Sequence, residues 1–175
     1  MRKSLSGFTI VELLIVIVVI AILAAIAIVA YTGIQNSGND SAVQSDLSKL
    51  KKKVELFYAE NSYYPVSNNA MLSLEFKATT SAYQTHSVDY NLLYCQPWSV
   101  STQQYSIVAL SKSGSIFWTS NEIGGIEKYT GIWQEDQADI CEDTGSPAGT
   151  GHNNVRGFAP DDEVNGPWRP WVGGN

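Results

Sequence analysis

The chain has 175 residues, of which 44% are hydrophobic and 16% charged, and its formal net charge is -6 at pH 7. These values fit one globular domain with an appendage, and they exclude a wholly disordered chain and a membrane protein with many spans. The negative charge argues against general nucleic-acid binding, which depends on clustered Lys and Arg. Two cysteines and two histidines without zinc-finger spacing, and no H-E-x-x-H or G-x-S-x-G motif, leave no basis for common hydrolase chemistry, so we expect no enzyme.

An uninterrupted apolar run extends from Leu13 to Ala30. At ~1.5 Å per residue this run spans about 27 Å, close to the thickness of a bilayer's hydrocarbon core. Its apolar side chains cover every direction around the helix axis, whereas a buried helix of a soluble protein would show a polar face. The run therefore predicts one transmembrane helix. Arg2 and Lys3 precede it and favour a topology with the N-terminus in the cytoplasm and the remaining chain outside.

Glu12 lies inside the apolar block, where a charged group is costly and therefore predicts a partner. The other interpretation is an unpartnered carboxylate close to the membrane surface.

A cleaved secretory signal competes with the membrane anchor, because Ala25-Ile26-Ala27 has the small-x-small pattern of a cleavage site. The length of the apolar run and the position of Glu12 both count against that cleaved signal.

Residues 3–13, KSLSGFTIVEL, resemble the class III signal of type IV pilins and of type II secretion pseudopilins. The resemblance implies that a prepilin peptidase cleaves between Gly7 and Phe8 and methylates the new amino group of Phe8. It also implies that Glu12 attracts the N-terminus of a neighbouring subunit during filament growth. The implied fold is an α+β pilin fold, in which a long N-terminal helix packs on a small antiparallel sheet and a long C-terminal loop region follows.

The predicted organisation has four parts: a leader at residues 1–7, a transmembrane and assembly helix at 8–31, a hinge and amphipathic helix at 32–62, and a globular head at 63–175. Many members of the family carry a proline late in the first helix, where this chain has Val29. We place a hinge at residues 33–39 instead, because glycine weakens helix interiors and two glycines lie there.

The amphipathic helix has its apolar residues spaced three and four apart: Val43, Leu47, Leu50, Val54 and Phe57. Ser41 and Gln44 form a predicted capping box at its start, and Pro65 predicts its end near Asn61. The charged residues are assigned mostly to the solvated face: Lys49, Lys51, Lys52 and Lys53, with Asp46 and Glu55.

Three strands are predicted from β-branched and aromatic residues: 88–94, 105–110 and 115–119. The short segment 112–114 separates the last two and predicts an antiparallel hairpin. We expect one face of this sheet to pack on the amphipathic helix, and Trp118 and Trp133 to be core or semi-core residues.

Cys95 and Cys141 are the chain's two cysteines, and both lie in the part predicted to be outside. A disulfide between them is the simplest interpretation, and two free thiols the alternative; the bridge would contribute about 4 kcal/mol through loop entropy. Many pilins resemble this arrangement.

The tail from Glu142 to Asn175 reads as an extended loop, whose tryptophans cover the sheet, contact another subunit or form an adhesive surface.

Acidic residues near the second cysteine raise the question of calcium, which takes six to eight oxygen ligands. The candidate ligands are Asp136, Asp139, Glu142 and Asp143. A solvated acidic loop is the favoured interpretation, and the resemblance to calcium-binding major pseudopilins keeps the metal as an alternative. No other cofactor is expected. His86 and His152 have no catalytic or metal-ligand spacing, and we read both as structural or solvent-facing.

The predicted function is that of a structural subunit, a major or minor pilin that polymerises through its N-terminal helix into a surface filament for adhesion, motility or DNA uptake. The implied partners are other pilins, the prepilin peptidase, the membrane, and the platform protein and ATPase of pilus assembly. Before assembly the subunit is a single-pass cytoplasmic membrane protein, and after assembly it is extracellular. The alternatives are a type II secretion pseudopilin and a membrane-anchored binding module that does not polymerise.

Overall fold

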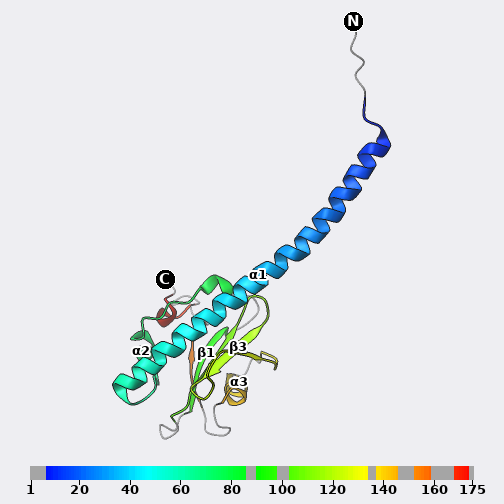
Figure 1. Ribbon diagram of the computed structural model, residues 1–175. Coiled ribbons are helices and arrows are strands. Elements are labelled where there is room, and N and C mark those ends of the chain that lie inside the picture. The colour runs from blue at the N-terminus through cyan, green and yellow to red at the C-terminus, as the bar shows by residue number, and fades with distance from the viewer. Residues whose placement is uncertain are drawn as a thin grey trace. The chain divides into compact units, whose positions relative to one another are not determined.

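The computed structural model describes residues 7–85, 90–97, 103–133, 137–145, 152–158 and 168–173. The chain divides into two compact units, Met1–Asn36 and Ser37–Asn175. One long helix, α1 (Ile10–Asn61), contributes residues to both units. The fold is α+β with a pilin-like arrangement, in which the second part of α1 packs on an antiparallel sheet (Figure 1). The predicted fold class is confirmed.

Helix α1 ends where the sequence predicts. Ser62 follows its last residue with a left-handed backbone, φ 64°, and the Ser62 N–H donates to the carbonyl of Tyr58 at 2.7 Å. A left-handed residue after the last turn is a common way to satisfy terminal carbonyls and stop a helix. Pro65 then disfavours helical geometry at Tyr64, so α1 cannot continue through this segment.

The predicted capping box at Ser41 is wrong. The helix is continuous across residues 33–39, so Ser41 lies in its interior, and the Ser41 hydroxyl donates to the Ser37 carbonyl at 2.8 Å. This bond to the preceding turn is the usual use of a serine hydroxyl within a helix. The boundary between the two compact units lies in the same stretch, after Asn36. The hinge at residues 33–39 stays a prediction about motion, without a break in secondary structure.

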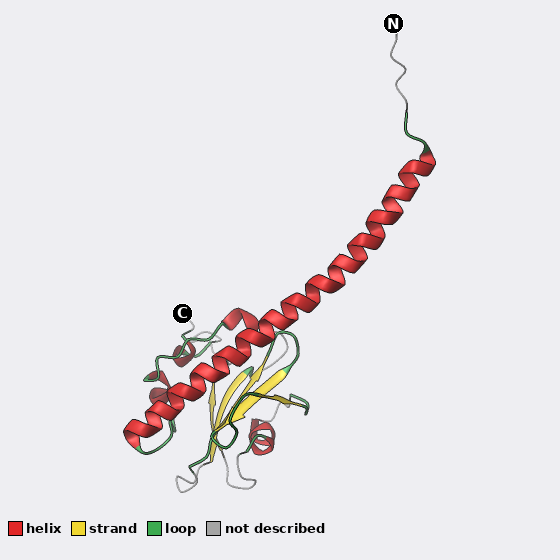
Figure 2. Cartoon of the chain, in the orientation of Figure 1, coloured by secondary structure: helices red, strands yellow, loops and turns green. Residues whose placement is uncertain are grey.

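The sheet has five strands: β1 (Leu92–Pro97), β2 (Ser106–Leu110), β3 (Ile116–Ser120), β4 (Glu127–Tyr129) and β5 (His152–Arg156). Their order is β4-β3-β2-β1-β5, and every neighbouring pair is antiparallel (Figure 2). The predicted hairpin is confirmed, with Leu110 opposite Ile116 and Gly114 supplying the turn with φ 88°. The first strand was predicted too early: it begins at Leu92, and part of the predicted range lies outside the described residues.

Alternating side chains give the sheet two covered faces. One face packs on α1 through a core that includes Val43, Leu47, Leu50, Val54, Tyr94, Tyr105, Ile107 and Ala109. The other face packs on α3 (Gln137–Asp143) through Leu93, Cys95, Val108, Leu110, Ile116, Ile140 and Cys141. The apolar stripe predicted on α1 is therefore confirmed as a core face. Trp118 and Trp133 lie half-buried against the α3 side, as expected for semi-core aromatics.

The C-terminal segment is more ordered than the predicted extended loop. Residues 152–156 form the edge strand β5 beside β1, and a short 3-10 turn, η2 (Pro170–Val172), buries Trp171 and Val172 in the core. Trp168 packs edge-on against both Tyr83 and Phe158. The described tryptophans of the tail thus cover the head. Two further elements complete the fold: α2 (Asn68–Leu72), capped by Ser67, and η1 (Thr80–Ala82).

Candidate functional site

The start of α1 is closed by a reciprocal cap between Thr9 and Glu12. The Glu12 carboxylate accepts the backbone N–H of Thr9 at 2.9 Å and the Thr9 hydroxyl at 2.8 Å, while the Glu12 N–H donates to that hydroxyl at 3.2 Å. This is the capping-box arrangement of a threonine followed three residues later by a glutamate. The sequence contains the T-x-x-E signal, but the two interpretations given above for Glu12 were pairing with a neighbouring subunit and a carboxylate without a partner.

Gly7 and Phe8 precede this cap without helical structure, and Phe8 is 89% exposed. A peptide bond in an irregular, exposed segment is open to an enzyme, because no helical hydrogen bond has to break before the bond enters an active site. The structure therefore places the predicted cleavage position, between Gly7 and Phe8, immediately before the first turn of α1.

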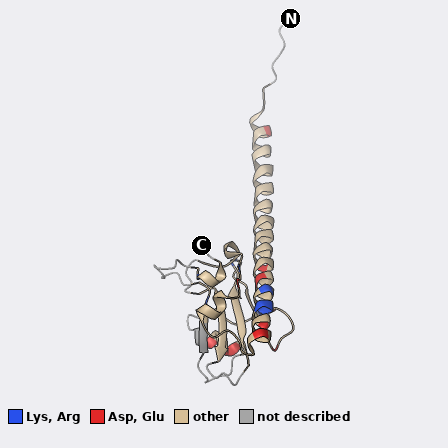
Figure 3. Cartoon of the chain, turned by 90° about the vertical axis from the view of Figure 1, so that its left-hand side faces the viewer, with Lys and Arg blue, Asp and Glu red and all other residues tan. Residues whose placement is uncertain are grey.

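The apolar surface of the first unit is uncovered. From Ile10 to Ile34 every residue of α1 is exposed, and by length and composition the helix could cross a membrane. Between Ile10 and Ile34 the only charged residue is Glu12, and the next charged residue along the chain is Asp40. Figure 3 shows this long uncharged stretch of the helix in tan. Contiguous apolar surface on this scale needs a partner, either lipid or protein.

In the second unit, Asp46 is a buried carboxylate on α1. It accepts the Thr79 N–H at 2.5 Å and the Tyr83 hydroxyl at 3.4 Å, and Lys49 donates to it at 3.2 Å. Its residue exposure is 0%. The assignment of Asp46 to the solvated face is wrong, because the segment around Thr79 folds back over this part of the helix and desolvates the carboxylate.

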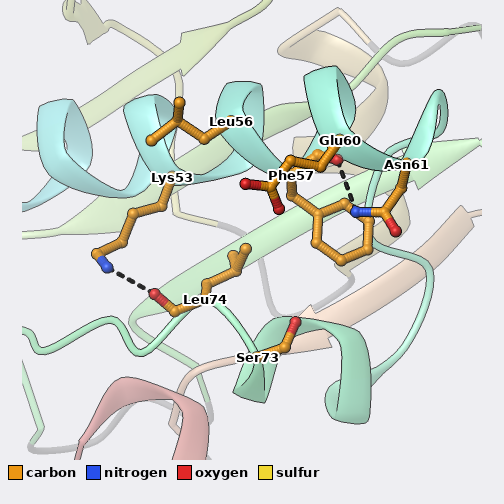
Figure 4. A pocket seen from close by; sticks show the side chains of 7 residues that line it. All are labelled: Lys53, Leu56, Phe57, Glu60, Asn61, Ser73 and Leu74. Carbon is orange, nitrogen blue, oxygen red and sulfur yellow. Dashed lines mark hydrogen bonds between the residues drawn. The ribbon is translucent and has the colours of Figure 1, made fainter.

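Two of the lysines also serve the fold. The Lys51 ammonium donates to the carbonyls of Ser120 and Ile123, and the Lys53 ammonium donates to the Leu74 carbonyl at 2.6 Å. Figure 4 shows Lys53 at the edge of a hollow of about 320 Å³ between α1 and the segment that follows α2. Lys49 and Lys52 are exposed, as predicted for the solvated face, but Lys51 and Lys53 are half-buried anchors of loops.

Glu55 is the second acidic residue placed wrongly on the solvated face. Its carboxylate accepts the Tyr105 hydroxyl at 2.7 Å and the Tyr64 hydroxyl at 3.3 Å. Burial and the adjacent carboxylate raise the pKa of Tyr64 to about 12 and raise the pKa of Tyr105 still further. Both causes favour the neutral phenol, so these tyrosines stay protonated hydrogen-bond donors at physiological pH.

The predicted disulfide between Cys95 and Cys141 is present, with the two Cα atoms 5.6 Å apart. It joins β1 to α3 on the face of the sheet opposite α1, and both residues are buried. The bond therefore ties α3 to β1, an interior strand of the sheet.

Comparison with known proteins identifies the N-terminal segment. Residues 2–28 match the family described as a prokaryotic N-terminal methylation motif. The chain is also 28% identical, over 139 residues, to the type IV wide pilus major component PilA4 of Thermus thermophilus, an alignment that covers 79% of this chain and 98% of the relative. The chain is therefore similar to type IV pilins both in its N-terminal motif and over most of its length. No solved structure matches it.

These similarities give a meaning to the geometry at the N-terminus. The matched motif includes the Gly7–Phe8 bond, the Thr9–Glu12 cap and most of the exposed apolar helix. The alignment with the relative covers 139 residues, far more than the matched motif at residues 2–28, so the similarity extends beyond the N-terminal helix. The subunit is thus of the pilin or pseudopilin type as a whole.

The structure describes three of the four candidate calcium ligands, and all three lie on α3. Asp139, Glu142 and Asp143 lie on α3, where Asp143 accepts the Tyr129 hydroxyl at 2.6 Å, and Asp136 lies outside the described residues. Within the described ranges no group of three or more acidic, His or Cys side chains converges. Calcium binding near α3 stays the untested alternative to a solvated acidic segment. Of the two histidines, His86 lies outside the described residues and His152 begins β5.

Proposed function

We propose that this chain is a type IV pilin that is cleaved between Gly7 and Phe8, methylated on Phe8 and polymerised through the first half of α1 into a surface filament. The observation that carries the proposal is the exposed apolar helix that begins at the Thr9–Glu12 cap and lies within the matched methylation motif. Burying that surface against neighbouring subunits would replace lipid contacts with protein contacts.

The assembly role of Glu12 follows from its charge. Cleavage would create a protonated amine at Phe8, since the reference pKa of an α-amine is ~7.7 to 8.0. That amine and the carboxylate of Glu12 are both costly in an apolar helix bundle, and pairing them between subunits relieves both costs. The Thr9 donors hold the carboxylate at the first turn of the helix until the partner arrives.

The similarity to a wide-pilus major component supports a role as the filament's structural subunit, not as an enzyme. We also propose the partners of such a subunit: other pilins, the prepilin peptidase, the assembly platform protein and the assembly ATPase. The precursor would cross the cytoplasmic membrane once, with Arg2 and Lys3 inside and the disulfide-bonded head outside.

Mass spectrometry of material sheared from the cell surface tests processing and export together. The expected N-terminal peptide begins at N-methylated Phe8. A terminus near Ala27, or intact Met1 confined to membranes, would contradict the proposal.

Substitutions of Glu12 test polymerisation. Glu12→Ala should abolish filaments while processed protein accumulates in the membrane. Glu12→Gln retains an acceptor for the Thr9 N–H but removes the charge, and it should fail in the same way if charge pairing drives assembly. Glu60→Ala, an exposed acidic position near the other end of α1, is the matched control and should assemble normally. Filaments that persist unchanged in Glu12→Ala would favour an anchored module that does not polymerise.

A further inference from the structure

A line of tyrosine rings runs through the second unit from its surface to its core. Tyr58 stacks on Tyr64 with ring centroids 4.5 Å apart and planes inclined by 26°. Tyr64 meets Tyr105 edge-on at 4.7 Å, and Tyr105 stacks on Tyr94 at 5.7 Å. The assembly function proposed above uses none of these rings.

Glu55 supplies this line with a proton acceptor. A phenol that loses an electron near neutral pH also loses its proton, because the oxidised phenol is a strong acid. A carboxylate already hydrogen-bonded to the phenol takes that proton directly, and Glu55 accepts hydrogen bonds from both Tyr64 and Tyr105. The Tyr94 hydroxyl is buried and has no hydrogen-bond partner, so its ring lacks an acceptor and is a poor site for oxidation.

Tyr58 is the outer end of the line. It is half-buried, and its hydroxyl donates to the side chain of Gln103, whereas Tyr64, Tyr94 and Tyr105 are at most 5% exposed. An oxidant in solution therefore reaches Tyr58 first. The ring that Tyr58 touches face to face is Tyr64, which has Glu55 as its acceptor.

We propose that Tyr58 and Tyr64 form an oxidative cross-linking site, where a haem peroxidase using hydrogen peroxide joins the two rings as dityrosine. Each ring gives up one electron and its phenolic proton, and a carbon–carbon bond forms between ring carbons adjacent to the hydroxyls. The two hydrogens on those carbons then move to the phenolic oxygens and restore both aromatic rings. The two electrons and two protons reduce one hydrogen peroxide to two waters.

The bond would fasten the last turns of α1 to the segment that leaves the helix. Tyr58 lies on α1, while Tyr64 follows the left-handed residue Ser62 and packs in the core beneath the helix. Because the two rings lie face to face, the bonded product requires them to turn toward an edge-to-edge arrangement. The product would prevent the end of the helix from detaching from the core under load.

The test treats the full-length protein in detergent micelles with a haem peroxidase and hydrogen peroxide. Dityrosine fluorescence is measured on the monomer band, and peptides are mapped by mass. Cleavage after Glu60 separates Tyr58 from Tyr64 in the unmodified chain. The expected product is a pair of peptides that stays joined after this cleavage and has lost two hydrogen atoms.

Three tyrosine variants make the test specific. Tyr58→Phe and Tyr64→Phe should lose the cross-link, and Tyr63→Phe should keep it, because Tyr63 contacts Phe57 instead. Glu55→Gln should lower the yield, since an amide accepts a proton poorly. Melting curves before oxidation show whether each variant is folded. Tyr58→Phe is expected to be the best tolerated of the substitutions, because Tyr58 is half-buried and not fully buried. A cross-link that maps to Tyr63 or Tyr105, that persists in Tyr58→Phe, or that forms solely between molecules would overturn the proposal.

Discussion

The carboxylate of Asp46, in the interior of α1, accepts the backbone N–H of Thr79 at 2.5 Å and is completely buried. This bond joins the helix to a segment more than thirty positions later in the chain. The bond lies in the core, where loss of the carboxylate would leave the Thr79 N–H buried without a hydrogen-bond acceptor.

Removing the Asp46 carboxylate should therefore be costly. We expect Asp46→Ala to lower the free energy of unfolding by about 2–4 kcal/mol, because the Thr79 N–H and the Tyr83 hydroxyl lose their acceptor in a dry environment. Asp46→Asn, which retains a carbonyl oxygen, should cost less than Asp46→Ala. Urea unfolding measures both values. Equal stabilities for Asp46→Ala and the unmodified protein would show that the buried acceptor contributes nothing.

Lys51 and Lys52 are neighbours that should behave differently. Lys51 donates to two backbone carbonyls, at Ser120 and Ile123, whereas Lys52 is exposed. We expect Lys51→Met to lower the free energy of unfolding by about 1–3 kcal/mol, and Lys52→Met to change it by no more than about 0.5 kcal/mol. Hydrogen exchange at residues 120–125 provides a second readout, and faster exchange should be confined to Lys51→Met.

The cap at the start of α1 gives a prediction about Thr9. Thr9→Val removes the hydroxyl that accepts the Glu12 N–H, and we expect the first turn to lose about 0.5–2 kcal/mol of stability. Thr9→Ser keeps the hydroxyl and should retain the cap. Amide exchange at residues 10–13 in micelles measures the difference. Unchanged protection in Thr9→Val would mean that the carboxylate of Glu12 alone holds this turn.

Tyrosine ionisation predicts how the head responds to alkali. The pKa of Tyr64 is raised to about 12 from an ordinary value of 10.0, first by burial and then by Glu55. A raised pKa in the folded state means that Tyr64 loses its proton more readily in the unfolded chain. The stability that the neutral Tyr64 phenol contributes is therefore complete below pH 10 and is lost as the pH rises from 10 to about 12. The melting temperature should fall across that interval together with the rise in tyrosinate absorbance. Tyr129, whose pKa is raised to about 12 mainly by its hydrogen bond to Asp143, should contribute with the same sign.

For Glu55→Gln we expect a smaller alkaline loss than for the unmodified protein, because the negative neighbour of Tyr64 and Tyr105 is gone. A melting temperature that stays constant from pH 8 to 12 would rule out a role for these phenols in stability.

The sequence alone was sufficient for features that depend on neighbouring residues. The apolar run, the motif around Gly7 and Glu12, and the three-and-four spacing from Val43 to Phe57 are properties of short segments, and they identified the helix, its core face and its end. The T-x-x-E cap at Thr9 is equally local and was overlooked.

Tertiary structure decided the roles of the polar residues on the second half of α1. Asp46, Lys51 and Glu55 look solvated in a helical projection, but each also has a distant partner. Thr79, Ile123 and Tyr105 lie 33, 72 and 50 positions away from them, respectively. The same holds for β5, whose residues 152–156 form an edge strand because β1 lies beside them. Periodicity reports how a segment is arranged around its own axis, whereas desolvation and long-range hydrogen bonds depend on which distant segment covers it.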